Sequence, residues 1–280
     1  MPARSANSAD DSLLDKSLEE LLNIVTVRKR EENVLDVPAA VTHFSEQTLD
    51  DYNIRSFADY ATKTPNLSFA YGNGATAGDA ATAISNARTI AIRGVAGAHT
   101  TGFYIDDTPL PGAVVVRLVD LLGIEVLKGP QGTLYGESSL GGNVRLISNA
   151  PDLTQNNLRY MLNVGQSKDS GNSLNSGGEA IGNVVVSPGV LALRIAGFWD
   201  DSAGYMSRNY LSDINDPTSP RISADNQGAQ RNFGGSLTAL MRLAQDVDLS
   251  FRVIHQDLHD NGFPAGYAPL RSAVRVRDSL

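Results

Sequence analysis

Three patterns of hydrophobic and polar residues follow one another along this chain, and each predicts a different kind of structure. Between residues 37 and 67, the short apolar run Val41–Phe44 is typical of a strand. The next apolar residues recur at the spacing of one helix face: Ile54, Phe57, Ala58 and Ala61. Pro65 then ends the predicted helix, because a proline cannot continue it. This part of the chain therefore predicts small α/β units.

Between residues 89 and 148, short β-branched runs alternate with glycine-containing turns. Four of the runs are predicted to be strands of one small sheet: Thr89–Arg93, Phe103–Ile105, Ile124–Leu127 and Val144–Ile147. The preceding stretch, Tyr71 to Ala87, is small and polar without any period, which predicts an exposed loop. The first half of the chain is thus expected to be an α+β domain with a small mixed sheet and short helices.

After Pro151 the apolar residues alternate with polar ones over longer segments. Five segments have this period of two: Leu158–Val164, Ala180–Val186, Leu191–Trp199, Phe233–Leu243 and Val247–Ile254. The connections are unequal, short at Ser187–Gly189 and long at Trp199–Gln230, as in transmembrane β-barrels with short turns on one side and long loops on the other. Membrane barrels with a plugged lumen have about 22 strands, and five or six antiparallel strands cannot close such a barrel. The sequence therefore predicts an incomplete barrel, and with it a fragment or a truncated gene product.

Composition excludes several other classes of protein. A net charge of −8 in 280 residues argues against nucleic acid as a partner. The absence of cysteine excludes disulfides and thiolate metal sites, and no run of about 18 apolar residues offers a transmembrane helix. The first twelve residues lack the apolar core of a secretory signal peptide, and residues 1–23 are expected to be a flexible segment, with a short helix beginning after Ser17.

The remaining motifs favour ordinary structure over catalysis. The glycines of Gly129–Gly132 lack both the GK[ST] ending of a P-loop and the GxGxxG pattern of a dinucleotide loop, so we interpret them as turn residues. Successive residues of a strand point to opposite faces, so the adjacent carboxylates of Asp106 and Asp107 would not face a common substrate. We therefore interpret these two residues as part of a turn. His255 and His259 fall in an alternating, strand-like segment without the glutamate of HExxH. We therefore expect no enzymatic activity, no cofactor and no metal site.

The two densest pieces, IRG at Ile92–Gly94 and EVLKGPQGTLYG at Glu125–Gly136, resemble the plug domain of TonB-dependent outer-membrane receptors. The order IVTVRKREENVLDVPAAVTHFS, PNLS, IRG, FYIDDTPL and EVLKGPQGTLYGESSLGGNVRLIS supports this resemblance. It implies a plug domain over residues 24–151, preceded by the flexible segment 1–23 and followed by the N-terminal part of a β-barrel domain over residues 152–280.

The resemblance also implies roles for individual residues. A TonB box, the extended segment that pairs with a strand of TonB, would comprise Ile24, Val25, Thr26 and Val27; the alternative is an ordinary first strand of the plug. Arg93 and Lys128 match cations that latch the plug to carboxylates of the barrel wall, with partners beyond residue 280; the alternative is exposed basic residues at strand ends. The ligand-facing apical loops would include these residues: Tyr71, His99, Thr100 and Gly112. For His99, a solvated loop histidine is the alternative.

By this resemblance the protein would be an energy-coupled receptor of the cell outer membrane that takes up a scarce nutrient, with a ferric siderophore as the expected substrate. Its partners would be TonB with ExbB and ExbD, the nutrient ligand and the outer-membrane lipid. The plug would lie in the barrel lumen with its N-terminus in the periplasm. The alternatives are a non-transporting plug-like interaction or signalling module, or a truncated remnant.

Overall fold

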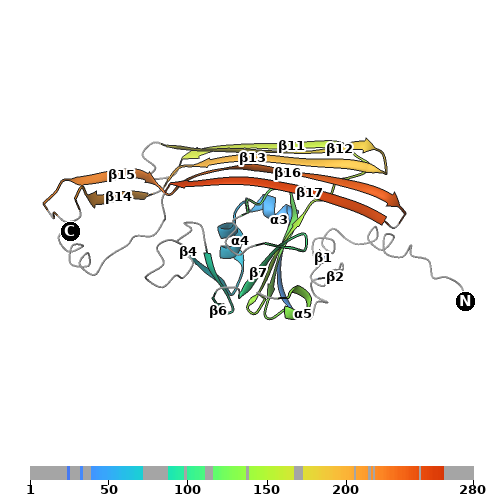
Figure 1. The fold of residues 1–280 in the computed structure, drawn as a ribbon, viewed down its shortest axis with the longest axis horizontal. Helices are drawn as coiled ribbons and strands as arrows, with labels where there is room; N and C mark the ends of the chain where they lie inside the picture. Colours follow the sequence, from blue (N-terminus) through green and yellow to red (C-terminus); the bar gives the residue numbers. More distant parts are fainter. Residues whose placement is uncertain are drawn as a thin grey trace, which may run out of the picture. The chain divides into compact units, whose positions relative to one another are not determined.

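The computed structural model describes residues 24–25, 32–33, 39–71, 88–97, 100–110, 116–136, 139–166, 173–204, 206–213, 216, 218–245 and 247–261. The chain divides into two compact units, Met1–Ala150 and Pro151–Leu280, called here the N-terminal unit and the C-terminal unit. Short elements make up the first unit and long strands dominate the second (Figure 1). None of the helices in the described ranges has the length and hydropathy of a membrane-spanning helix.

A five-stranded sheet, the mixed sheet, lies at the centre of the N-terminal unit. In spatial order its strands are β3 (Ala40–Ser45), β9 (Leu121–Lys128), β10 (Gly142–Ser148), β7 (Thr101–Ile105) and β8 (Thr108–Leu110). β10 runs parallel to β7, whereas β9 runs antiparallel to both β10 and β3. The α+β class and the mixed sheet predicted from the sequence are confirmed.

One predicted strand belongs to a different sheet. β5 (Arg88–Ile92) pairs antiparallel with β4 (Leu67–Tyr71) and with β6 (Val95–Ala96) to form a separate three-stranded sheet. The prediction that the strand at residues 89–93 joins the other three in one sheet was therefore wrong. The spacing of apolar residues identifies a strand, but it does not select the partner with which that strand pairs.

Two short helices follow β3, and each begins at a residue that can cap it. The Ser45 hydroxyl accepts a hydrogen bond from the Thr48 backbone N–H (3.3 Å) at the start of α3 (Glu46–Asp51). At the start of α4 (Phe57–Lys63), the Asp59 carboxylate accepts from the Ser56 backbone N–H (2.8 Å) in a capping box. α4 ends before Pro65, as predicted, but Ile54 precedes this helix and is not part of it.

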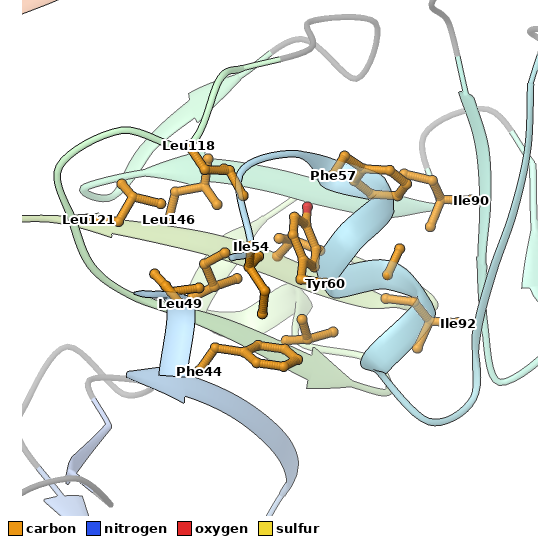
Figure 2. Close-up of a cluster of buried hydrophobic side chains, with 14 residues drawn as sticks. Phe44, Leu49, Ile54, Phe57, Tyr60, Ile90, Ile92, Leu118, Leu121 and Leu146 are labelled. Atoms are coloured by element: carbon orange, nitrogen blue, oxygen red, sulfur yellow. The ribbon is translucent and has the colours of Figure 1, made fainter. Parts of the chain in front are cut away.

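The main hydrophobic core lies between these helices and the sheets (Figure 2). Ile54, Ile92, Ile124, Val126 and Val144 are at most 1% exposed. The ring of Phe57 on α4 contacts the Tyr60 ring edge-on, with 5.1 Å between the ring centroids. Each large apolar side chain that is fully buried contributes about 1.5–3 kcal/mol. The core therefore fixes α3 and α4 against one face of the mixed sheet.

The C-terminal unit is built on a second five-stranded sheet, the long sheet, in which all pairs are antiparallel. Its strands are β11 (Asn157–Gln166), β12 (Leu174–Ser187), β13 (Leu191–Ser202), β16 (Ala229–Ala244) and β17 (Val247–Asn261). They lie side by side in Figure 1. All five predicted strand segments are confirmed, as is the short turn between β12 and β13. The connection between β13 and β16 contains a hairpin that the sequence reasoning missed, formed by β14 (Met206–Leu211) and β15 (Arg221–Gln227).

The two faces of the long sheet differ in chemistry. On β11, four alternate apolar side chains are 68–77% exposed: Leu158, Tyr160, Leu162 and Val164. Their partners on β12 include Gly178, over which the Trp199 ring of β13 lies. On the other face of β12, Glu179 and Asn183 are buried. One face of the sheet is thus apolar and exposed, as the lipid-facing side of a membrane barrel is, while the other buries polar residues together with Ile181.

Candidate functional site

The N-terminal candidate segment is described only in part. Ile24 and Val25 form β1, which pairs antiparallel with β2 (Glu32–Asn33) in the register Ile24 to Asn33 and Val25 to Glu32. The other two candidates, Thr26 and Val27, lie outside the described residues. An extended segment of this kind has main-chain groups available for strand pairing, which is the property a TonB box requires.

Arg93 and Lys128 come together at one end of the mixed sheet. Arg93 stands in a tight turn after β5 with φ of +54°, and its backbone N–H donates to the Asn66 carbonyl (2.9 Å). Its guanidinium lies so close to Gly129 that a Cβ there would be 3.1 Å from Nη1. Lys128 is the residue before that glycine, so two cations from distant parts of the chain are neighbours.

The electrostatics of this pair are unfavourable within the N-terminal unit. Lys128 is only 9% exposed, and burial, reinforced by the positive charge of Arg93, lowers the pKa of its ammonium group. No carboxylate among the described residues contacts either cation. Two like charges held together without a described counter-charge form an arrangement that an external carboxylate would stabilise.

The loops at the same end of the sheet are held by backbone contacts. The Gly141 N–H donates to the Thr100 carbonyl (2.8 Å), and the Gly129 N–H donates to the Gly141 carbonyl (2.8 Å). The Thr100 hydroxyl closes its own loop by donating to the Gly97 carbonyl (3.0 Å). Gly129 and Gly136 have φ of +108° and +71°, which confirms their role as turn residues. The loop between them contains the short helix α5 (Gly132–Tyr135), which was not predicted.

The other three apical candidates are Tyr71, His99 and Gly112. Tyr71 is the last residue of β4 and pairs with Arg88, so it stands at the edge of the predicted loop. His99 and Gly112 lie outside the described residues. Of the four apical candidates, Thr100 is therefore the one whose side-chain contacts can be given.

A buried charge cluster, which the sequence reasoning missed, lies on the face of the mixed sheet opposite α3 and α4. Glu125 of β9 is directly opposite Arg145 of β10, and their side chains form an ion pair with 2.6 Å between Oε2 and Nη1. Glu125 is fully buried, and the Arg145 side chain is 5% exposed. Arg145 also donates to Asp107 (2.9 Å), and it lies 5.8 Å from the centre of the Tyr135 ring.

The surroundings of the charge cluster are largely apolar and aromatic. The Tyr104 hydroxyl donates to the Tyr135 carbonyl (2.6 Å), and burial raises the pKa of Tyr135 to about 12. Burial also lowers the pKa of His43, which is opposite Glu125 on β3, although the negative charge of Glu125 acts in the other direction. A signal for the cluster exists in the sequence: Glu125 and Arg145 are single charges inside apolar strands, and such charges require partners.

Two observations define the class of protein. A mixed-sheet domain with short helices is followed by long antiparallel strands with one apolar face, which is the architecture of membrane receptors whose barrel encloses a plug. The family model "TonB-dependent Receptor Plug Domain" matches residues 33–143. Residues 33–143 of the chain are therefore similar to the plug domain of TonB-dependent receptors.

Individual relatives agree with this assignment. The pesticin receptor of Yersinia pestis is 39% identical over 72 residues, which is 24% of this chain and 11% of the relative. The ferrioxamine receptor of Yersinia enterocolitica is 30% identical over 132 residues, or 45% of this chain and 17% of the relative. The chain thus spans less than a fifth of the length of these relatives.

A solved structure extends the similarity of fold beyond the plug. The ferripyoverdine receptor of the outer membrane of Pseudomonas aeruginosa superposes on 84% of this chain with a TM-score of 0.63 and 17% sequence identity, using 27% of its own chain. The fold of a plug with antiparallel barrel strands therefore covers most of the described residues.

Proposed function

We propose that this chain acts in a TonB-dependent receptor of the outer membrane that imports a scarce nutrient, and that the nutrient is a ferric siderophore. The observation that carries the proposal is the plug-domain match over residues 33–143. Relatives that are named as ferrioxamine and catecholate siderophore receptors, and a similar structure bound to ferripyoverdine, support an iron-containing ligand.

In this proposal the plug occupies the barrel lumen and transport begins with ligand binding on its outward-facing loops. The candidate loop residues are Tyr71, His99, Thr100 and Gly112. Binding there shifts the equilibrium toward the state in which the Ile24–Val27 segment is free in the periplasm. TonB then adds a strand to that segment, and the inner-membrane proton gradient, acting through ExbB and ExbD, supplies the pulling force.

Arg93 and Lys128 serve as the latch between plug and barrel wall in this mechanism. Their proximity supports the role, because the buried ammonium of Lys128 beside the Arg93 guanidinium gains most from a carboxylate on the wall. A partly buried ion pair is expensive to break on one side, at about 3–5 kcal/mol. The latch would therefore hold the plug until ligand binding and TonB act together.

Growth under iron limitation tests the transport function. Cells that carry the intact receptor are compared with a deletion strain on a panel of ferric siderophores, with cobalamin and glycans as other nutrient classes. We expect a growth defect in the deletion strain that is restricted to one siderophore class. Equal growth of both strains on every nutrient would exclude import as the function.

A separate binding experiment tests the TonB box. A peptide that contains Ile24–Val27 is used to capture the TonB C-terminal domain, with an Ile24→Pro peptide as the control, because proline removes a main-chain donor and resists strand pairing. We expect capture by the first peptide and none by the second. Absence of capture by both would reject the box assignment without bearing on nutrient uptake.

A further inference from the structure

Hydrogen-bonded clamps lie on both sides of the unit boundary and are separated by two residues, the exposed Ala150 and the buried Pro151. On the N-terminal side, the Asp106 carboxylate accepts from both the backbone N–H (2.9 Å) and the hydroxyl of Ser148. The next residue, Asn149, donates its backbone N–H to the Asp120 carbonyl (3.1 Å) and its amide to the Asp120 carboxylate (3.2 Å). The last residues of the N-terminal unit are therefore fixed to the body of that unit.

On the C-terminal side, Asn183 of β12 holds the segment that leads into the long sheet. Its amide oxygen accepts from the Asp152 N–H (2.9 Å), and its amide nitrogen donates to the carbonyls of Asp152 (2.9 Å) and Gln155 (2.6 Å). The side chain thus satisfies three main-chain groups at once while it is only 1% exposed. We call this arrangement the Asn183 clamp.

Other contacts extend the Asn183 clamp over the whole segment 151–156. The Leu153 carbonyl accepts from the Gly189 N–H (3.0 Å) in the turn between β12 and β13, and Leu153 itself is buried. The Asn156 amide oxygen accepts from the Val185 N–H (2.6 Å). Because these bonds join the segment to β12 and to its turn, the segment is part of the C-terminal unit although it is not a strand.

Clamps of this kind matter in a protein on which force acts. The proposed function, on which this inference rests, places a pull on the N-terminal segment, and that force passes along the chain through residue 150. A buried amide with three hydrogen bonds opens only when all three groups are exposed together. The bonds of Ser148 are exposed, whereas those of Asn183 are partly buried.

We propose that Asn183 is a positioning residue for transport. It fixes the start of the long sheet, so that the part of the chain displaced with the plug ends at residue 151. The Asn183 clamp therefore limits how far a pulled plug can extend.

Force spectroscopy on the intact receptor in a lipid bilayer tests the proposal directly. A handle at Ile24 is pulled until extension stops, and the final contour length is compared between variants. We expect Asn183→Ala to lengthen the final extension by about 17 Å, because residues 152–156 are released at roughly 3.4 Å each. Asn175→Ala is the matched control: Asn175 also lies on β12, but it accepts from the Ala203 N–H (2.7 Å) at the other end of the strand. Equal final extensions for wild type and Asn183→Ala would overturn the proposal.

A second variant keeps the test decisive if Asn183→Ala does not assemble. Asn183→Asp retains the acceptor for the Asp152 N–H but removes both donated hydrogen bonds, so the same lengthening relative to wild type is expected. A wild-type extension for this variant would also overturn the proposal.

A labelling experiment in cells separates this inference from the proposed function. Leu153→Cys is buried in the Asn183 clamp, so its reaction with a small maleimide reports opening of the segment. We expect Asn183→Ala to raise labelling several-fold in cells with TonB and not in cells without it. If the extension lengthens but labelling is independent of TonB, the anchor stands and the proposed energy coupling fails. If labelling stays at the wild-type level in cells where TonB supports uptake, the anchor fails.

Discussion

Removal of the Arg145 side chain is the most informative single perturbation of the N-terminal unit. The guanidinium contacts a fully buried carboxylate, Glu125, and an exposed one, Asp107, while it packs over the Tyr135 ring. Arg145→Met keeps most of the apolar stem and removes only the charge. The buried Glu125 carboxylate then loses the partner that lies 2.6 Å away.

The expected loss of stability is large because the cost of a buried charge far exceeds the net value of the pair. Deletion of one partner of a buried ion pair destabilises by about 3–5 kcal/mol, and the cation–π contact with Tyr135 adds about 0.5–1 kcal/mol. Total stabilities of domains are only about 5–15 kcal/mol. The double variant Glu125→Met with Arg145→Met leaves no carboxylate in the buried position, so it should be at least about 2 kcal/mol more stable than the single variant.

Urea denaturation of residues 1–150, followed by far-ultraviolet circular dichroism, measures these differences. Asp50→Ala is the control: the Asp50–Arg55 pair has the same chemistry (3.1 Å), but Asp50 is 41% exposed, and such pairs contribute about 0–1 kcal/mol. The reasoning is wrong if Arg145→Met costs no more than Asp50→Ala, or if the double variant is as unstable as the single one.

Three further predictions concern the same unit. Burial and Arg93 lower the pKa of Lys128, so the folded state binds fewer protons than the unfolded state and stability rises as pH increases toward 10.5. Lys128→Met should stabilise residues 1–150 and abolish this rise in urea titrations, and a rise that persists in the variant would contradict the assignment to Lys128. Burial raises the pKa of Tyr135 to about 12, so this residue should lower stability by at most about 3 kcal/mol between pH 10 and 12. Burial also raises the pKa of Tyr104, so Tyr135→Phe should reduce the decrease without removing it, and an unchanged decrease would contradict the role of Tyr135. Gly142→Ala should destabilise the N-terminal unit by about 2 kcal/mol or more, because φ is +151° and the new Cβ would overlap the Leu127 carbonyl of β9. Gly132→Ala is the control in the same assay and should have little effect, because nothing lies within 4 Å of the added Cβ.

The strands of both units could be predicted from local sequence alone: short apolar runs between glycine-containing turns mark those of the N-terminal unit, and alternation of apolar and polar residues marks those of the C-terminal unit. The five strands of the long sheet, β11, β12, β13, β16 and β17, all contain segments with a period of two. The composition of Ser187–Gly189 predicts the turn between β12 and β13. The β14–β15 hairpin was missed because its few apolar residues, among them Met206, Leu211 and Ile222, do not recur with a period of two. Local pattern therefore predicts strands with a regular apolar face and misses those without one.

The sequence motifs predicted individual residues of the candidate site but not the contacts between them. IRG and KGPQG identified Arg93 and Lys128, but their convergence depends on a turn that places Arg93 at positive φ beside Gly129. The Glu125–Arg145 pair was not predicted because it depends on the register between β9 and β10. That register brings together two charges that are 20 residues apart in the sequence. The Asn183 clamp escaped for the same reason, since its partners precede it by about 30 residues.

The short junction restricts the way in which a pulled plug can yield. With Ser148 and Asn149 fixed to the N-terminal unit and Asp152 fixed by Asn183, only Ala150 and Pro151 separate the two clamps, so the unit has little slack with which to move as a rigid body. The end nearest the proposed TonB box is different. β3 is an edge strand of the mixed sheet with β9 as its one partner among the described strands, whereas β9 and β10 are paired on both sides. A pull on the N-terminal segment therefore acts first on an edge strand, and we infer that an opening begins by detachment of β3 while the centre of the sheet, held by the Glu125–Arg145 pair, stays in place.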